Sequence, residues 1–191
     1  MSFVFVSGAA RSGKSKWAET HACSLAAELS DEGRASGLVY IATAQVTDAE
    51  MQRRVVLHKA ARKSKGFATL ERCTDVGKIA SELSSGSTVL LECLGTLLAN
   101  EMFGTGEAES SDLGDPDFYV QKIFEDILSL IAHAAHVLVV SNDIFSDGMA
   151  YDETIENYRR ALGELHVRLA DVADLAVECA GGLAFRHRSA R

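Results

Sequence analysis

Proline, tryptophan and paired cysteines are scarce in this chain. Its 191 residues include one proline, one tryptophan and four cysteines, and no two cysteines form a C-x-x-C pair. We therefore expect no disulfide framework or cysteine-rich zinc site, and we interpret the cysteines as small core residues in a reducing compartment. No apolar run approaches the roughly 20 residues of a membrane-spanning helix, and no signal peptide is visible. These absences predict a soluble, cytoplasmic protein.

Basic residues are also in the minority. The chain has 19 Lys and Arg against 27 Asp and Glu, which gives a formal net charge of −8. Because nucleic acids and anionic membranes repel an acidic protein, we expect neither a nucleic-acid partner nor a membrane anchor. The length predicts a single domain over residues 1–191, and the 47% hydrophobic content suffices for a substantial core.

A phosphate-binding motif stands near the N-terminus. Residues 8–15 read Gly8-Ala9-Ala10-Arg11-Ser12-Gly13-Lys14-Ser15, which satisfies G-x-x-x-x-G-K-[ST] directly after an apolar run. In this motif glycines let successive backbone N–H groups approach a polyphosphate, and the following helix directs its positive end toward it. Lys14 is expected to contact the β- and γ-phosphates, and the Ser15 hydroxyl is expected to ligate Mg²⁺. We therefore predict nucleotide binding by all eight residues.

Strand and helix patterns alternate along the rest of the chain. Continuous apolar runs typical of buried parallel strands occupy residues 3–6, 38–42, 67–70, 88–92, 136–140 and 175–179. Helical periodicity follows or separates them at residues 16–29, 47–62, 75–83, 94–103, 118–135 and 152–171. Residues 181–182 are a Gly-Gly turn that leads into an antiparallel edge strand at 183–188. The pattern predicts a three-layer α/β sandwich of the phosphate-loop NTPase (RecA-like) kind, with a mainly parallel sheet.

Two further residues are candidates for chemistry. Glu92 ends an apolar strand, where the carboxyl ends of parallel strands line a ligand crevice, so it is placed to act on Mg²⁺. His58 shares the spacing of Met51 and Val55 on a segment rich in Lys and Arg. Spacing alone favours a solvated basic helix face with a packed histidine.

Several motifs together resemble one family. They are the phosphate loop, Tyr40-Ile41-Ala42-Thr43-Ala44-Gln45, the block from Asp48 to His58-Lys59, Leu90-Leu91-Glu92-Cys93, Asn100, Ser141-Asn142-Asp143, and the terminal pattern from Arg159 to Asp174. This set is similar to the bifunctional adenosylcobinamide kinase/adenosylcobinamide-phosphate guanylyltransferases of cobalamin biosynthesis. The resemblance covers nearly the whole chain, and the tyrosine strand followed by the His-Lys helix is its most specific part.

The resemblance implies a function and a set of roles. Such enzymes phosphorylate adenosylcobinamide with ATP or GTP, then transfer GMP from GTP through a guanylyl-histidine to give adenosylcobinamide-GDP. It implies that His58 is the nucleophile, that Lys14 is catalytic, and that Mg²⁺ is held by Ser15 and Glu92. It also implies a homotrimer. The remaining residues implied to bind nucleotide are Ala44, Gln45, Val46, Lys59, Arg62, Glu71 and Glu92.

The chain departs from the family pattern at several positions. Leu57 replaces the first of two histidines, Lys63 replaces a proline, the loop at 143–151 differs, and His166-Val167 replaces an Asn-Gln pair. A guanylyltransferase with a weakened kinase half is therefore an alternative. A different small phosphate-loop kinase without a covalent intermediate, or a non-catalytic nucleotide-binding module, are others. The general base of the kinase step stays open among Asp48, Glu50, Glu71 and Asp143.

Overall fold

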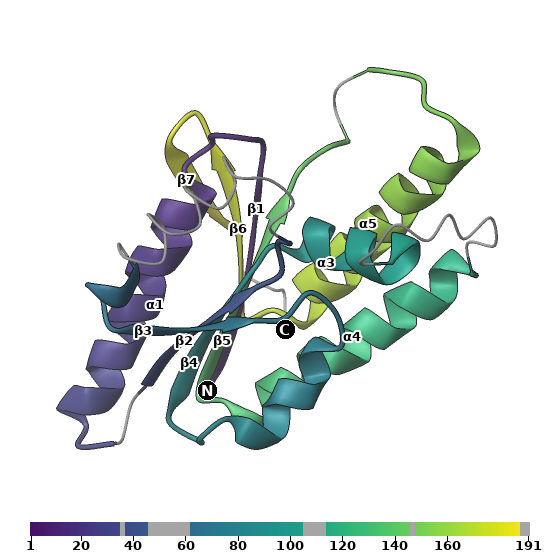
Figure 1. The fold of residues 1–191 in the computed structure, drawn as a ribbon. Helices are drawn as coiled ribbons and strands as arrows, with labels where there is room; N and C mark the ends of the chain where they lie inside the picture. The colour runs from purple at the N-terminus through teal and green to yellow at the C-terminus, as the bar shows by residue number, and fades with distance from the viewer. Residues whose placement is uncertain (35–36, 46–61, 105–113, 146–147, 188–191) are drawn as a thin grey trace.

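The computed structural model describes residues 1–34, 37–45, 62–104, 114–145 and 148–187 (Figure 1). Its elements follow one another as β1 (Ser2–Gly8), α1 (Lys14–Asp31), β2 (Gly37–Ala42), β3 (Phe67–Glu71), the 3₁₀ helix η1 (Val76–Glu82), β4 (Ser87–Glu92), α3 (Leu94–Phe103), α4 (Pro116–His133), β5 (His136–Asn142), α5 (Glu153–Val172), β6 (Leu175–Ala180) and β7 (Leu183–His187).

One sheet of seven strands organises these elements, in the order β3-β2-β4-β5-β1-β6-β7. All neighbouring pairs are parallel except β6 and β7, which pair antiparallel. The predicted α/β class, with its mainly parallel sheet and single antiparallel edge strand, is thus confirmed. Because the other strands run the same way, their carboxyl ends meet at one edge, where Ala42 aligns with Glu71 and Glu92, and Gly8 aligns with Asn142 and Cys179.

Helices cover both faces of the sheet, which makes three layers (Figure 1). Helix α1 packs on one face against β4, β5, β1 and β2, while α3, α4 and α5 pack on the other against β5 and β1. Each face therefore has its own hydrophobic cluster, with Val4, Val6 and Leu90 on the α1 side and Phe3, Phe5 and Leu91 on the other. Strand residues alternate between the two clusters because successive side chains point to opposite faces of a sheet.

Helix α1 meets the sheet through small side chains. Its buried row is Lys14, Ala18, Ala22, Ala26 and Leu29. The sequence pattern predicts one apolar stripe that joins Trp17, His21, Leu25 and Leu29 with the alanines beside them. The alanines and Leu29 are buried as predicted, whereas Trp17, His21 and Leu25 are only partly buried at the margin of this row. Small alanine side chains let the axis of α1 lie close to the sheet, and the phosphate loop joins the end of β1 to the start of this helix.

Three other expectations need correction. The helix expected at 75–83 is a 3₁₀ helix, and α4 begins at Pro116 rather than residue 118, because Asp115 caps it by accepting a hydrogen bond from the Asp117 N–H at 3.0 Å. Only Cys179 of the four cysteines is buried. Cys93, expected in the core, instead caps α3 by accepting from the Thr96 N–H at 3.4 Å. Among the described residues, no helix is long and apolar enough to cross a membrane.

Candidate active site

The phosphate loop leaves β1 through a contact that only glycine permits. A Cβ added to Gly8 would stand 2.4 Å from the carbonyl oxygen of Cys179 and 2.6 Å from Ser12 Oγ. Gly13 has φ +95°, a conformation that L side chains rarely adopt, and it precedes the first residue of α1. The strand, the tight turn and the helix start thus occur together, and that context separates a functional phosphate loop from a chance sequence match.

The cation and hydroxyl of the motif occupy the first turn of α1. Lys14 is buried, and its Nζ donates to the Ala9 carbonyl oxygen at 3.1 Å across the loop. The Ser15 hydroxyl donates to Oε1 of Glu92, which lies at the end of β4. The expected juxtaposition of the phosphate loop with the strand-end acid is therefore present, since β4 and β1 are separated by β5 alone.

Tyr40 and Arg62 complete this side of the site. The Tyr40 hydroxyl donates to Glu92 Oε2 at 2.9 Å. Burial raises the pKa of Tyr40 well above its usual range, and the negative charge of Glu92 adds to this effect, so the hydroxyl stays protonated as a donor. The Arg62 guanidinium lies 3.7 Å from the centroid of the Tyr40 ring, a cation–π contact made by a buried side chain.

These groups line a cleft of about 660 Å³. The cleft brings together many residues that the sequence predicts for the site: Ala10, Arg11, Lys14, Ser15, Ala44, Arg62, Glu71 and Glu92. It also contains residues that were not predicted: Lys16, Glu19, Tyr40, Ala42, Cys93, Thr96 and Asn142. Ala42 and Asn142 are the last residues of β2 and β5, and Tyr40 lies two residues before the end of β2, so the parallel pattern could have indicated all three. Glu19 pairs with Lys65, a contact that no sequence pattern shows.

Gln45, a predicted nucleotide-binding residue, is hydrogen-bonded to Asn100 of α3. Its Nε2 donates to Asn100 Oδ1 at 3.0 Å. The Asn100 amide donates in turn to the carbonyl oxygens of Thr43, at 2.8 Å, and Cys73, at 3.0 Å. Asn100 is almost fully buried and ties the segment after β2 to α3. Two motif residues therefore hold the backbone that forms one wall of the cleft.

A second cavity of about 330 Å³ lies on the other side of the phosphate loop. Gly8, Ala9, Ala10, Arg11 and Ser12 line it together with Asp143, Glu178, Cys179, Ala180 and Gly181. Asp143, one of the candidate bases, is in this cavity and not in the larger cleft. Its N–H donates to the Gly8 carbonyl oxygen at 2.9 Å, and its Oδ1 accepts from the Phe145 N–H at 3.0 Å. These bonds link the end of β5 to the start of the loop.

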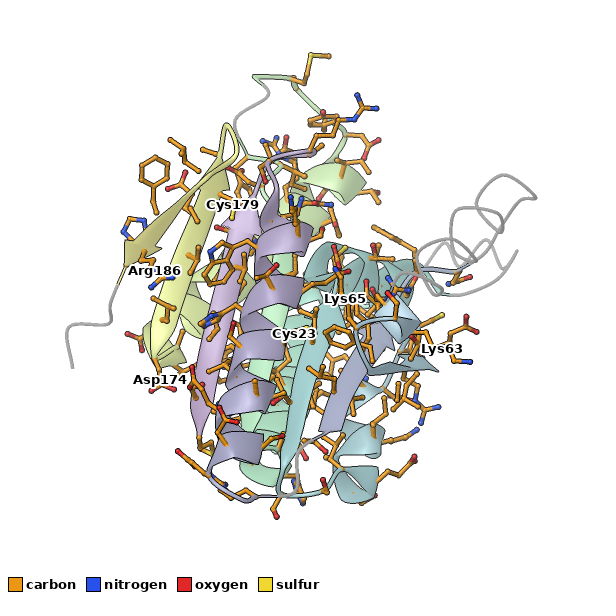
Figure 2. All side chains as sticks on the ribbon, turned by 90° about the vertical axis from the view of Figure 1, so that its left-hand side faces the viewer. Cys23, Lys63, Lys65, Asp174, Cys179 and Arg186 are labelled. Atoms are coloured by element: carbon orange, nitrogen blue, oxygen red, sulfur yellow. The ribbon has the colours of Figure 1, made fainter. Side chains whose placement is uncertain are left out.

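Not every motif residue belongs to the site. Asp174 lies at the opposite end of the sheet from Cys179, as Figure 2 shows. Its Oδ2 accepts from the Phe3 N–H at 2.7 Å and its own N–H donates to the Phe3 carbonyl oxygen at 2.9 Å, so it anchors the start of β1. His166 shares a 2.7 Å hydrogen bond with Ser141 Oγ and packs edge-on against Phe5 and Phe145. Burial lowers the pKa of His166 to about 4, so it is neutral near pH 7.

Some predicted site residues lie outside the described residues. They are Val46, His58 and Lys59, together with the candidate bases Asp48 and Glu50. Arg62, where the description resumes, is helical and buried at the cleft.

The oxygen donors at the loop suit Mg²⁺. A hydroxyl from Ser15 and a carboxylate from Glu92 are hard ligands that already touch each other, so a cation between them would need only a small separation. The part of the chain described here contains no group of three or more His, Cys, Asp or Glu that could hold a metal without a substrate. This donor set fits Mg²⁺, which is usually held by one or two protein groups plus substrate phosphates.

A phosphate loop that faces an acid on a nearby strand end, within a mainly parallel sheet, defines the class of phosphate-loop nucleotide-binding α/β proteins. Within that class the chain belongs to the cobinamide kinase / cobinamide phosphate guanyltransferase family, whose model matches residues 4–187. It is therefore a transferase.

Individual relatives agree with this assignment. The chain is 31% identical over 176 residues to the bifunctional adenosylcobalamin biosynthesis protein CobU of Escherichia coli K12, a match that covers 90% of this chain and 91% of that protein. It is 30% identical over 176 residues to CobU of Salmonella typhimurium LT2, with the same coverage. It is also 30% identical over 179 residues to CobP of Pseudomonas aeruginosa PAO1, covering 92% and 91%. Among solved structures, an ATPase domain gives a TM-score of 0.46 at 13% identity, covering 93% of this chain and 68% of that one, a likeness too distant to carry an argument.

Proposed function

We propose that residues 1–191 form a single catalytic domain that performs both reactions of its family. It phosphorylates adenosylcobinamide with ATP or GTP, and then transfers GMP from GTP to adenosylcobinamide phosphate through a guanylyl-histidine at His58. The observation that supports this most strongly is the contact of Ser15 with Glu92 beside the buried Lys14, in a chain that matches this family over nearly its whole length.

In the kinase reaction, the substrate hydroxyl oxygen forms a bond to the γ-phosphorus while the bond to the β-phosphate oxygen breaks. Lys14 and the loop N–H groups stabilise the charge on the phosphate oxygens. Mg²⁺, held by Ser15 and Glu92, would neutralise charge on the β- and γ-phosphates. The hydroxyl proton leaves to a base, and Glu71 is the candidate among the described residues that lines the cleft.

In the guanylyl transfer, an imidazole nitrogen of His58 forms a bond to the α-phosphorus of GTP, and pyrophosphate leaves. A phosphate oxygen of adenosylcobinamide phosphate then attacks the same phosphorus and the P–N bond breaks. This divides one displacement into two in-line steps and returns the histidine unchanged. The position of Arg62 in the cleft lining supports a role for its guanidinium in binding phosphate oxygens during both steps, and by resemblance Lys59 assists it.

The remaining assignments follow from the resemblance. Ala44, Gln45 and Val46 would contact nucleotide, although the Gln45 amide is held by Asn100 in this structure. A homotrimer and a cytoplasmic location complete the proposal, the latter supported by four free thiols and by the need for nucleoside triphosphates.

A guanylyltransferase with a weakened kinase half is the second candidate. It is favoured by the loop after β5, where the Phe145 ring packs on His166. His166 replaces an Asn of the family pattern. The change leaves Lys14, Ser15 and Glu92 in place but alters the segment that follows Asp143.

Separate assays of the two half-reactions test the proposal. Adenosylcobinamide with ATP or GTP reports phosphorylation, and chemically supplied adenosylcobinamide phosphate with GTP reports guanylyl transfer. We expect product in both assays. Product in the second alone supports the second candidate, and phosphorylation without guanylyl transfer would contradict the bifunctional assignment.

A further inference from the structure

Tyr40 contacts two charged residues of opposite sign at once. Its side chain is buried near the end of β2, with the ring beneath the Arg62 guanidinium and the hydroxyl on Glu92. All three side chains line the same cleft. Tyr40 therefore joins the basic side of the site to its acidic side.

The Glu92 carboxylate is held through both of its oxygens. Ser15 donates to Oε1, and Tyr40 donates to Oε2 at 2.9 Å. When the Ser15 hydroxyl directs its lone pairs toward a cation, its bond to Glu92 is lost. The hydrogen bond from the Tyr40 hydroxyl to Glu92 Oε2 then remains, and it keeps Glu92 Oε1 directed toward the phosphate loop. Without it the carboxylate would gain rotational freedom at the moment when its orientation matters.

Arg62 depends on the same ring. Its guanidinium lies 3.7 Å from the ring centroid, and its Nε is buried with no hydrogen-bond partner among the described residues. A guanidinium that stacks on an aromatic face is positioned by that face as well as by its hydrogen bonds. The Tyr40 ring is thus the surface on which the Arg62 guanidinium stacks, and it holds this cation at the cleft.

We propose that Tyr40 is a positioning residue that sets the orientation of the Glu92 carboxylate through its hydroxyl and the position of the Arg62 guanidinium through its ring. This inference rests on the proposed function, because it assigns Tyr40 a role toward the Mg²⁺-nucleotide of that site. The two roles are separable: Tyr40→Phe removes only the hydroxyl, whereas Tyr40→Leu removes the ring as well.

The test measures GTP affinity with EDTA and with Mg²⁺ by isothermal titration calorimetry, in the wild type and each variant. The ratio of the two affinities reports how strongly bound Mg²⁺ and GTP favour each other. Tyr40→Phe should lower this ratio roughly tenfold, since a hydrogen bond to a charged group is lost, while the affinity in EDTA stays at the wild-type value. Tyr40→Leu should also weaken binding in EDTA several-fold, because Arg62 loses its stacking surface.

Tyr158→Phe is the matched control. The Tyr158 hydroxyl donates to the Gly95 carbonyl oxygen at 3.0 Å, and Tyr158 does not line the cleft. This variant should keep the wild-type ratio. As a second readout, Glu92→Gln should lower the ratio too, and adding Tyr40→Phe to it should cause no further loss, because the hydroxyl acts through the carboxylate.

A wild-type ratio in Tyr40→Phe, an equal loss in Tyr158→Phe, or additive losses with Glu92→Gln would overturn the inference. Its failure is distinguishable from failure of the proposed function. The ratio of GTP affinities with Mg²⁺ and with EDTA can be measured without a corrinoid and without a covalent adduct. If Tyr40→Phe lowers this ratio as expected but His58 is not guanylylated, the proposed function is contradicted and the role of Tyr40 is not.

Discussion

Ser15 on α1 and Glu92 on β4 are hydrogen-bonded although 77 residues separate them in the chain. The contact arises because α1 starts directly above the strand ends and β4 stops at the same edge of the sheet. In the proposed function, this hydroxyl and carboxylate are the metal-binding half of the site, and Lys14 with the loop backbone is the phosphate-binding half.

Ser15→Ala removes the hydroxyl that we propose as a ligand of Mg²⁺. We expect the Mg²⁺ concentration for half-maximal guanylyl transfer to rise at least about tenfold, because one of two protein oxygens is lost. Titration of the rate with Mg²⁺ measures this. Ser24→Ala, which removes a hydroxyl that donates to the Thr20 carbonyl oxygen farther along α1, should leave the titration unchanged. A wild-type titration in Ser15→Ala would remove Ser15 from the metal site.

Lys14→Ala removes the buried cation of the loop. Both half-reactions should fall by about 100-fold or more, since a charge-assisted phosphate contact is worth a few kcal/mol. Initial rates of each half-reaction at saturating substrate measure the loss. Lys78→Ala, at an exposed lysine paired with Asp75, is the control and should retain full rates. Kinase activity that survives Lys14→Ala would show that the loop does not bind the phosphoryl donor.

Gly8→Ala should disturb the loop through sterics alone. The new Cβ would meet the backbone oxygen of Cys179 at 2.4 Å, so the loop or β6 must shift. We expect a loss of roughly 1–3 kcal/mol in the free energy of unfolding and weaker GTP binding. Urea unfolding and calorimetry check both. Gly37→Ala, where a Cβ meets nothing within 4 Å, is the comparison and should change neither. Equal behaviour of the two variants would contradict the close approach.

His166→Asn should flatten the pH dependence of stability. The folded pKa of about 4 lies below the ordinary 6.5, so between these values the unfolded chain binds a proton that the folded chain does not. Stability from this residue is therefore complete above pH 6.5 and lost as the pH falls toward 4, by up to about 3 kcal/mol. Asn carries no titrating group at this position. Urea unfolding at about pH 7 and about pH 4.5 should show a smaller loss in the variant. An equal loss would mean that His166 titrates normally in the fold.

The sequence predicted the architecture well because local signals and the fold agree. The apolar run that ends at Glu92 and the run that leads to Gly8 both read as buried parallel strands, and the structure confirms this. The predicted stripe of α1 included Trp17 and Leu25 beside Ala18 and Ala22, but the sheet surface selects only the small alanine side chains for full burial. Periodicity indicates that a helix has a buried face, but the closeness of packing decides which residues form it.

The site was predicted only in part for a similar reason. A motif indicates which residue types meet a phosphate, so Lys14 and Ser15 could be assigned directly. The stacking of Arg62 on Tyr40 and the Gln45–Asn100 hydrogen bond are long-range contacts with no local pattern. Asp143 was grouped with Glu71 as a candidate base, but it lies in the cavity behind the loop, whereas its chain neighbour Asn142 lines the cleft. Successive residues along a strand point to opposite faces of the sheet, and this alternation was not applied to the end of β5.

The most direct test of the proposed mechanism is the fate of the α-phosphate of GTP. The enzyme is incubated with Mg²⁺ and GTP labelled with ³²P at the α- or the γ-position, and the protein is then denatured and mapped. We predict label from the α-position only, on His58, labile to acid and resistant to alkali as a phosphoramidate, and absent from His58→Ala. Labelling that persists in His58→Ala, or a wild type that turns over without any adduct, would contradict the mechanism.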